Sequence, residues 1–428
     1  MPGGAAVVDL ERLERPESEV GALDVQALRR QFPILGERVH GKPLSYLDNA
    51  ATTQKPEAVI EAVANFYRHD NANIHRGIHT LAERATAAYE AVREQVRRWI
   101  GAPSAHEVIF TRGTTESINL VAHGWAGRHL EPGDEIVLTV AEHHANLVPW
   151  QVVARRTGAV LRHAPLTEDG AIDEDAVCEL VRSPRARLCA ITGASNVLGH
   201  EPDLRRICAE ARRHGVRTLV DGAQWVPHAP VDVGETGCDW LCFSGHKMLG
   251  PTGVGVLWGR RELLEQTEPL LTGGEMIRVV ELDRATWNDV PWRFEAGTMN
   301  IAQVVGLGAA IRTLEQIGMA RVQRHVRAVT GYAIERLRAL GATIYGPLDP
   351  TRRCGLVAFT LPEVHPHDLA QWLDQEGIAI RAGHHCAMPL HAQLGLGSTA
   401  RASFYVYNDE AEVDRLVQAI EGARAFFR

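Results

Sequence analysis

The feature that most constrains the fold is a series of short apolar runs that alternate with helical patterns between about residues 106 and 259. Val, Ile and Leu dominate these runs, and Gly or Pro closes the helical stretches between several of them. The runs are "HEVIFTRG", "DEIVLTV", "AVLRHAP", "RLCAITG", "RTLVDGA", "DWLCFSG" and "GVGVLWG". Nearly continuous apolar strands separated by amphipathic helices are typical of a mostly parallel sheet with helices on both faces. We therefore expect an α/β fold.

The pattern changes after about residue 300, where long helices and a few strands predict a smaller α+β domain. "NIAQVVGLGAAIRTLEQIG" and "RHVRAVTGYAIERLRALG" are the helices, and "GLVAFTL" and "RASFYV" are strands. We place the junction near "FEAGTMN". The predicted parts are a mobile arm (1–24), a segment that packs with the small domain (25–45), a large domain (46–300) and a small C-terminal domain (301–428).

Composition excludes several classes of protein. The formal net charge is -8 and the pI is about 6.2, which argues against general binding to nucleic acid or to anionic membranes. No apolar run is long enough to span a bilayer, and the N-terminus lacks the basic start and apolar stretch of a signal peptide. We expect a cytoplasmic protein.

The cysteines disfavour a disulfide framework and a structural zinc site. There are 7 of them, an odd number, and they are scattered without a CxxC pair. Only the stretch "RAGHHCAMPL" surrounds one of them, Cys386, with other reactive side chains. From these residues alone Cys386 could be a metal ligand, half of a redox pair, a buried filler or a nucleophile.

Polar side chains follow three of the predicted strands, at the edge where ligands collect in parallel sheets. "FTRGTTES" places Gly113, Thr114 and Thr115 where a strand turns into a helix, which suits either a phosphate or ordinary helix capping. Asp221 ends another strand, where it could cap a helix, and Lys247 follows a third, where it could simply be solvated. Together they match pyridoxal phosphate, which needs an amine for a Schiff base, a carboxylate for the pyridine nitrogen and donors for the phosphate.

Ten motifs in order carry a resemblance to a known family. They are "YLDNAATTQKP", "NIHRGIHTLA", "TRGTTESINLVA", "EHHANLVPWQ", "SNVLGH", "VDGAQ", "SGHKMLGPTGVGVLWG", "FEAGT", "RAGHHCAMPL" and "RASFYVYN". From about residue 25 onward the chain resembles the SUF-type (group II) cysteine desulfurases and selenocysteine lyases. These are pyridoxal-phosphate enzymes of fold type I in the class V aminotransferase superfamily. The resemblance implies a seven-stranded, mostly parallel sheet in the large domain and a homodimer with shared active sites.

The resemblance also implies a role for each matching residue. Lys247 would bind the cofactor covalently, Asp221 would pair with its ring nitrogen, and Gln224 would contact its phenolic oxygen. His143 would stack on the ring and take part in proton transfer, while Asn196 would lie near the substrate and the cofactor oxygen. The phosphate would be held by Thr115, Ser244 and His246, and in the neighbouring subunit by Thr298. Arg401 would bind the substrate carboxylate, with Arg381 as a further substrate-binding residue.

In this family Cys386 would be the nucleophile that takes sulfur from L-cysteine as a persulfide and leaves L-alanine. Arg381, His384 and His385 are candidates to supply positive charge that would favour its thiolate. The short loop after Cys386 resembles enzymes that pass sulfur to a partner of the SufE or SufU kind, for iron–sulfur cluster assembly. His384 or His385 could transiently join a zinc carried by a SufU-like partner. No metal site of the chain's own is predicted, although His384, His385, Cys386 and His391 make one conceivable.

Two alternatives remain open at this point. The chain could be a selenocysteine lyase or cysteine-sulfinate desulfinase of the same family, but the intact Cys386 loop favours the desulfurase. It could also be a non-catalytic scaffold, which the joint presence of Lys247, Asp221, His143, Arg401 and Cys386 disfavours. The sequence departs from the family at Gly193 and Ala194, where relatives commonly carry bulkier residues.

Overall fold

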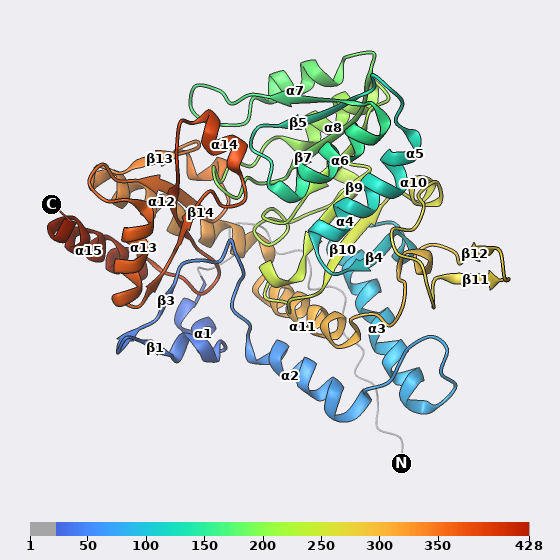
Figure 1. The fold of residues 1–428 in the computed structure, drawn as a ribbon. Coiled ribbons are helices and arrows are strands. Elements are labelled where there is room, and N and C mark those ends of the chain that lie inside the picture. Colours follow the sequence, from blue (N-terminus) through green and yellow to red (C-terminus); the bar gives the residue numbers. More distant parts are fainter. Residues whose placement is uncertain (1–22, 428) are drawn as a thin grey trace, which may run out of the picture.

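A seven-stranded sheet forms the centre of the structure, which is a computed structural model describing residues 23–427 (Figure 1). Its strand order is β4-β10-β9-β8-β7-β5-β6. The strands are β4 (Val108–Thr111), β5 (Glu135–Thr139), β6 (Val160–Ala164), β7 (Ala186–Thr192), β8 (Arg217–Asp221), β9 (Trp240–Ser244) and β10 (Gly255–Gly259). Each of the seven apolar runs noted in the sequence forms one of these strands.

The sheet is mostly parallel, as predicted. β5 pairs in parallel with β6 and β7, and β7, β8 and β9 continue the parallel pairing. β10 is the exception, because it runs antiparallel to both β9 and β4. The carboxyl ends of β7, β8 and β9 therefore meet at one edge, where parallel α/β sheets bind their ligands.

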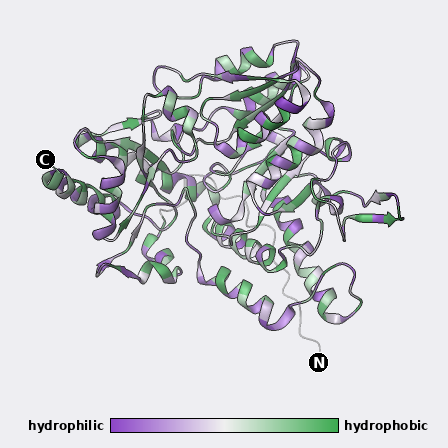
Figure 2. Ribbon diagram, in the orientation of Figure 1, coloured by the Kyte–Doolittle hydropathy of each residue, from purple (hydrophilic) through white to green (hydrophobic). Residues whose placement is uncertain are grey.

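Helices cover both faces of this sheet, and successive strand residues pack into two different cores. In β5, Ile136 and Leu138 belong to one apolar cluster and Val137 to the other, as the two-residue period of a strand requires. In Figure 2 the strands of the large sheet are mostly green, the colour of hydrophobic residues. The helices are α4 (Thr114–Leu120), α5 (Gly127–His129), α6 (Val148–Thr157), α7 (Glu174–Val181), α8 (Leu204–Arg213), α9 (Val233–Thr236) and α10 (Arg261–Glu265).

A second, four-stranded antiparallel sheet has the order β13-β14-β17-β16. Its strands are β13 (Thr343–Tyr345), β14 (Leu356–Thr360), β16 (Arg381–Gly383) and β17 (Thr399–Ser403). The helices α12 (Met319–Ala339), α13 (Pro366–Gln375) and α15 (Glu410–Phe427) pack with it (Figure 1). At the start of α14 (Met388–Gln393), the Met388 N–H donates to His144 Nε2 at 3.0 Å.

The N-terminal part of the described chain is joined to the C-terminal part by a short strand pair. β3 (Ser45–Tyr46) pairs in parallel with β15 (Ile378–Ala379), after α1 (Val25–Arg29) and the short hairpin of β1 (Arg38–Val39) and β2 (Lys42–Pro43). The long helix α11 (Ile301–Ile317) packs on α2 (Glu57–Asn65) and α3 (Thr80–Trp99).

A second hairpin lies outside both the seven-stranded and the four-stranded sheet. The hairpin of β11 (Ile277–Val280) and β12 (Ala285–Trp287) projects from the large sheet's side of the molecule (Figure 1). Residues 1–22 of the predicted arm lie outside the described residues, and the domain limits stay a prediction. None of the helices within residues 23–427 is long and apolar enough to cross a membrane.

Candidate active site

One cavity of about 270 Å³ collects nearly all of the predicted site residues. It lies at the carboxyl edge of β7, β8 and β9, where residues of β16 and β17 also reach it. The predicted residues that line it are Thr115, His143, Asn196, Asp221, Gln224, Ser244, His246, Lys247, Arg381, Cys386 and Arg401. Thr298 is exposed and lines a different cavity, together with Arg112 and Met299. Within this one chain it is therefore separate from the others.

Hydroxyl and amide groups gather where β9 ends and α4 begins. The backbone N–H of Thr114 donates to Ser244 Oγ at 2.9 Å, and the two side-chain hydroxyls are 2.7 Å apart. Thr115 follows in the first turn of α4 and is exposed. This end of the cavity offers hydroxyls and a helix N-terminus, the donors that suit a phosphate.

Asp221 and Lys247 supply opposite charges at the ends of neighbouring strands. Asp221 is the last residue of β8, and its Oδ1 accepts from the Ala223 N–H at 3.0 Å. Burial raises the pKa of Asp221, whereas it lowers the pKa of Lys247; each charge partly offsets the shift of the other. A buried carboxylate of this kind needs a cationic partner, which a protonated ring nitrogen would provide.

His143 lies over the same region as a neutral imidazole. Its Nδ1 accepts from the Ala145 N–H at 3.0 Å. Burial, with the charge of Lys247 as a further cause, lowers the pKa of His143 to about 3. The preceding residue, Glu142, is buried, and its carboxyl oxygens accept from Thr139 Oγ1 at 2.8 Å and Asn146 Nδ2 at 2.6 Å, which fixes the turn that presents His143.

Arg401 and Arg381 reach the cavity together because they are paired opposite each other on β17 and β16. Arg401 is buried; its Nη1 donates to Asn196 O at 3.0 Å and its Nη2 to Asp48 Oδ1 at 3.1 Å. The other oxygen of Asp48 lies 3.9 Å from Arg381 Nη1. Asp48 was missed by sequence reasoning, although its motif "YLDNAATT" was noted.

Four residues of the cavity hold buried polar atoms that find no hydrogen-bond partner among the described residues: Asn196 Oδ1, Gln224 Oε1, His385 Nδ1 and Arg401 Nε. Gln224 uses its Nε2 to donate to Ala50 O at 2.7 Å, and this contact was not anticipated. Unpartnered buried polar atoms are costly unless a ligand satisfies them. These atoms, the hydroxyl and amide donors that suit a phosphate, and the Asp221 carboxylate together fit pyridoxal phosphate and an amino acid.

Cys386 is the one exposed cysteine within residues 23–427, and it borders the same cavity as Lys247. Its loop is fixed on both sides, since Asn196 Nδ2 donates to His385 O at 2.6 Å and the His144 N–H donates to Cys386 O at 2.8 Å. His385 and Cys386 both adopt left-handed backbone conformations, with φ of 49° and 56°. Such φ values are uncommon outside glycine and cluster at functional sites.

The histidines beside Cys386 have different environments. His384 is exposed, whereas His385 is buried and its Nε2 lies 2.9 Å from Thr399 Oγ1. Burial, with Arg401 as the next cause, lowers the pKa of His385 to about 2. His385 is therefore neutral, and the expectation that it supplies positive charge to Cys386 is wrong. No group of three or more His, Cys, Asp or Glu side chains in the described part of the chain could hold a metal ion.

Comparisons with known proteins agree with this geometry. Residues 45–416 match the family described as Aminotransferase class-V. A probable cysteine desulfurase of Halalkalibacterium halodurans is 50% identical over 95% of this chain and 99% of its own, and a cysteine desulfurase of Klebsiella pneumoniae is 51% identical over 93% and 97%. The chain belongs to the cysteine desulfurase family of class-V aminotransferases.

The family assignment confirms the resemblance read from the motifs and the fold type. The crystal structure of the Escherichia coli cysteine desulfurase CsdA, in an S-sulfonic acid form, superposes with a TM-score of 0.88 at 43% identity, covering 95% of this chain and all of that one. Class-V aminotransferases use pyridoxal phosphate, so the predicted cofactor is also confirmed. The chain is thus a pyridoxal-phosphate-dependent enzyme of the desulfurase family.

Proposed function

We propose that this enzyme converts L-cysteine to L-alanine and stores the sulfur as a persulfide on Cys386. The observation that carries the proposal is that Cys386 and Lys247 line one cavity, together with the arginine that suits a carboxylate. A nucleophile on one side and an amine on the other can act on the two ends of a single small amino acid.

The positions of the residues that line the cavity support a role for each of them. Lys247 is the attachment point, Asp221 keeps the ring nitrogen protonated, and the free amide oxygens of Gln224 and Asn196 accept hydrogen bonds from the cofactor or the substrate. Thr115, Ser244 and His246 hold the phosphate, and Thr298 reaches the phosphate of the neighbouring subunit. His143, being neutral at physiological pH, can pack on the ring and exchange a proton. When bound, pyridoxal phosphate withdraws electrons from the substrate's α-carbon.

The chain's own groups then carry out the sulfur transfer. Arg401, assisted by Arg381, binds the substrate carboxylate, and Lys247 accepts and returns the α-proton. The Cys386 thiolate attacks the substrate sulfur, so that a sulfur–sulfur bond forms while the carbon–sulfur bond breaks. The electron pair of the broken bond stays with the substrate carbon, which is protonated to give alanine.

A homodimer and a protein sulfur acceptor complete the proposal. The exposure of Cys386 and of His384 beside it leaves the persulfide open to a partner of the SufE or SufU kind. Because His385 is buried and engaged with Thr399, His384 is the histidine available to a partner's zinc. We place this activity in the cytoplasm and in the supply of sulfur for iron–sulfur clusters.

Two variants of the yellow holoenzyme test this function. Cys386→Ala is expected to lower sulfide and alanine production from L-cysteine at least a hundred-fold and to spare selenocysteine cleavage, because selenium leaves without an enzyme thiol. Lys247→Ala is expected to abolish both reactions. Full cysteine turnover in Cys386→Ala would contradict the persulfide assignment, and retained turnover in Lys247→Ala would contradict the role of Lys247.

Purified acceptor proteins should accelerate turnover of the wild type; no acceleration by any acceptor would contradict the proposed partner.

A further inference from the structure

The chain carries nearly all of its positive charge on arginine. Among its 45 lysines and arginines, only Lys42, Lys55 and Lys247 are lysines. Lys42 is a half-exposed side chain that pairs with Glu376 at 2.9 Å, a contact that an arginine could also make. Lys247 is the proposed cofactor lysine. For Lys55, the reason for a lysine at this position still needs a physical explanation.

Lys55 is half-buried, and its ammonium donates to backbone oxygens. Its Nζ donates to Thr53 O at 2.5 Å and to His246 O at 3.0 Å. Burial lowers the pKa of Lys55 to about 7, and no charged group in the described part of the chain offsets that effect. A protonated amine held in this way, with no counter-ion among residues 23–427, reduces stability, so its position is better explained by what it holds than by its contribution to folding.

The group that it holds is the carbonyl directly before Lys247. Four donors converge on His246 O: the Thr53 N–H at 3.0 Å, Thr52 Oγ1 at 3.0 Å, Thr53 Oγ1 at 3.2 Å and Lys55 Nζ at 3.0 Å. A carbonyl oxygen has two lone pairs, so four donors fix its direction more firmly than a turn requires. The same Thr53 hydroxyl accepts from the Leu249 N–H at 2.9 Å, on the other side of Lys247.

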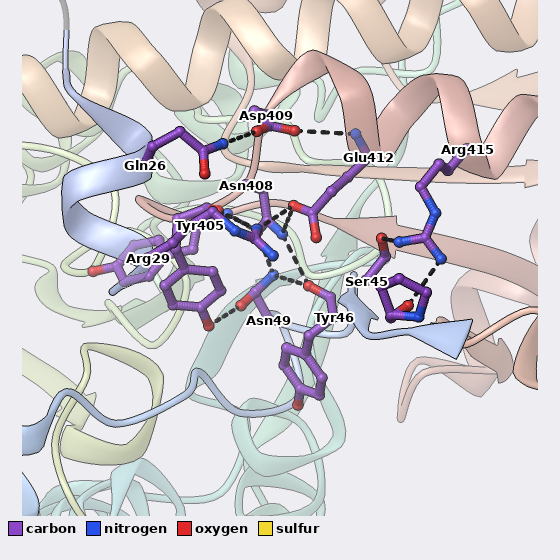
Figure 3. Close-up of polar contacts among 12 residues, drawn as sticks. Gln26, Arg29, Ser45, Tyr46, Asn49, Tyr405, Asn408, Asp409, Glu412 and Arg415 are labelled. Atoms are coloured by element: carbon purple, nitrogen blue, oxygen red, sulfur yellow. Dashed lines mark hydrogen bonds and ion pairs between the residues drawn. The ribbon is translucent and has the colours of Figure 1, made fainter. Parts of the chain in front are cut away.

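The segment that presents these donors is anchored at its other end. Asn49 Nδ2 donates to Ser403 O at 2.6 Å and to Asn408 Oδ1 at 3.0 Å, as Figure 3 shows for the contacts between Asn49 and Asn408. The Ala50 N–H donates to Ser403 Oγ at 2.9 Å. Residues 49–55 thus run as a fixed strap from the small sheet to the turn that carries Lys247.

We propose that Lys55 is a positioning residue for Lys247. Its ammonium, together with the hydroxyls of Thr52 and Thr53, fixes the peptide between His246 and Lys247 and thereby directs the Lys247 side chain toward the cofactor. The single nitrogen of an ammonium can donate to two neighbouring carbonyl oxygens, here Thr53 O and His246 O. The donors of an arginine lie on separate nitrogens in a planar fork and do not fit this arrangement. This inference rests on the proposed role of Lys247.

The test compares the holoenzyme with Lys55→Met, which keeps an unbranched side chain and removes the donors. We expect pyridoxal phosphate to dissociate about ten-fold faster, followed as the loss of the visible band of the bound cofactor during dialysis, because one charged hydrogen bond is worth about that factor. Lys55→Arg is expected to lie between Lys55→Met and the wild type. Lys42→Met, the same change at the half-exposed lysine, should match the wild type.

Thermal unfolding separates positioning from a merely structural role. Positioning predicts that the apo form of Lys55→Met melts near the wild-type apo form, while the stabilisation gained on adding pyridoxal phosphate is smaller. Equal losses in the apo and holo forms, or a dissociation rate within about two-fold of the wild type, would overturn the proposal. If Lys55→Met does not fold, Thr52→Val removes another of the four donors and should speed dissociation several-fold; an unchanged rate there would equally overturn it.

Borohydride reduction followed by peptide mapping distinguishes a failure of this inference from a failure of the proposed function. Because the chain has three lysines, each can be followed. Cofactor trapped on Lys247 in every variant, with unchanged dissociation in Lys55→Met, would refute only the positioning role. Cofactor trapped on Lys55 or Lys42 in the wild type would refute the assignment of Lys247 and the inference with it.

Discussion

Two nitrogens of the Arg401 guanidinium are bonded to the protein, and the third is left for a ligand. Its Nη1 and Nη2 are engaged by Asn196 O and Asp48, while Nε has no partner among the described residues. Asp48 therefore has two opposite effects on a substrate carboxylate. It orients the guanidinium, which favours binding, and it neutralises part of the charge, which disfavours binding.

Two substitutions of Asp48 separate these effects. Asp48→Ala removes the orienting bond, so we expect KM for L-cysteine to rise about ten-fold, the value of one charge-assisted hydrogen bond. Asp48→Asn keeps an oxygen for Arg401 Nη2 and removes the competing charge, so KM should stay within about three-fold of the wild type. Steady-state kinetics on both variants would measure this. A KM that rises equally in both would show that a neutral amide cannot orient Arg401, and that the ionic form of the hydrogen bond is required.

At Gly193, the reason for a residue without a side chain could not be read from the sequence. Gly193 departs from the family pattern, and the sequence offered no reason. In the structure a Cβ at Gly193 would lie 2.9 Å from Trp225 Cβ, closer than side-chain carbons come to each other. The departure is therefore matched by a bulky neighbour 32 positions away, which no local pattern could reveal.

At the scale of elements, strand β17 organises one side of the cavity by simple alternation. Thr399, Arg401 and Ser403 share a face because strand side chains repeat every two residues. Thr399 holds the Cys386 loop, Arg401 enters the cavity and Ser403 anchors Ala50. One strand thus places the nucleophile's loop, the carboxylate-binding arginine and the strap that ends at Lys55.

Thr399→Val tests how this strand restrains the Cys386 loop. The Thr399 hydroxyl lies 2.9 Å from His385 Nε2 and 3.1 Å from His391 Nε2, and both histidines are buried. We expect the variant to lose about 2 kcal/mol of stability, because buried polar atoms lose a partner. Alkylation of Cys386 by iodoacetamide should become several-fold faster as the loop loosens.

The matched control is Thr343→Val, the same change at an exposed position of the same sheet. It should leave both the unfolding free energy and the alkylation rate near those of the wild type. Wild-type alkylation in Thr399→Val would show that the loop is held by its backbone contacts alone.

Elements were also the scale at which the sequence was most informative. The strands of the large sheet were predicted because each is a continuous apolar run, and β14 was predicted for the same reason, whereas the strand predicted at "RASFYV" overlaps β17 only at residues 401–403. The antiparallel direction of β10 was not, since a run of apolar residues carries no information on strand direction. The site residues could be named only because ten motifs matched a family; "SGHK" alone would have suggested a solvated lysine.

At the scale of the whole molecule, the contacts that complete the site join distant parts of the chain. Asn49 and Asn408 are 359 residues apart, and Asp48 and Arg401 are 353 apart. Figure 3 shows how Arg29, Tyr46 and Glu412 surround the same junction. Such contacts follow from how the two sheets are placed against each other, and hydrophobic periodicity does not specify that placement.

Burial also gives the molecule a set of neutral histidines. The pKa is lowered to about 2 for His385, about 3 for His143 and about 4 for His200, His228 and His246, with burial as the largest cause in each case. A histidine whose pKa is lower in the folded than in the unfolded chain stabilises the fold fully above its unfolded value of 6.5. That stability is lost as the pH falls toward the folded value, because the unfolded state then binds more protons.

His200 allows this effect to be measured away from the cavity. It is 1% exposed, and its Nδ1 accepts from the Ile172 N–H at 3.1 Å. With a pKa near 4 when folded and 6.5 when unfolded, it should make the wild type lose about 3 kcal/mol relative to His200→Asn between pH 7 and pH 4. Urea denaturation of both proteins at several pH values gives this difference, with His69→Asn as an exposed control. A wild-type advantage that stays constant from pH 7 to pH 4 would mean that the pKa of His200 is the same in the folded and the unfolded chain, which would contradict the prediction.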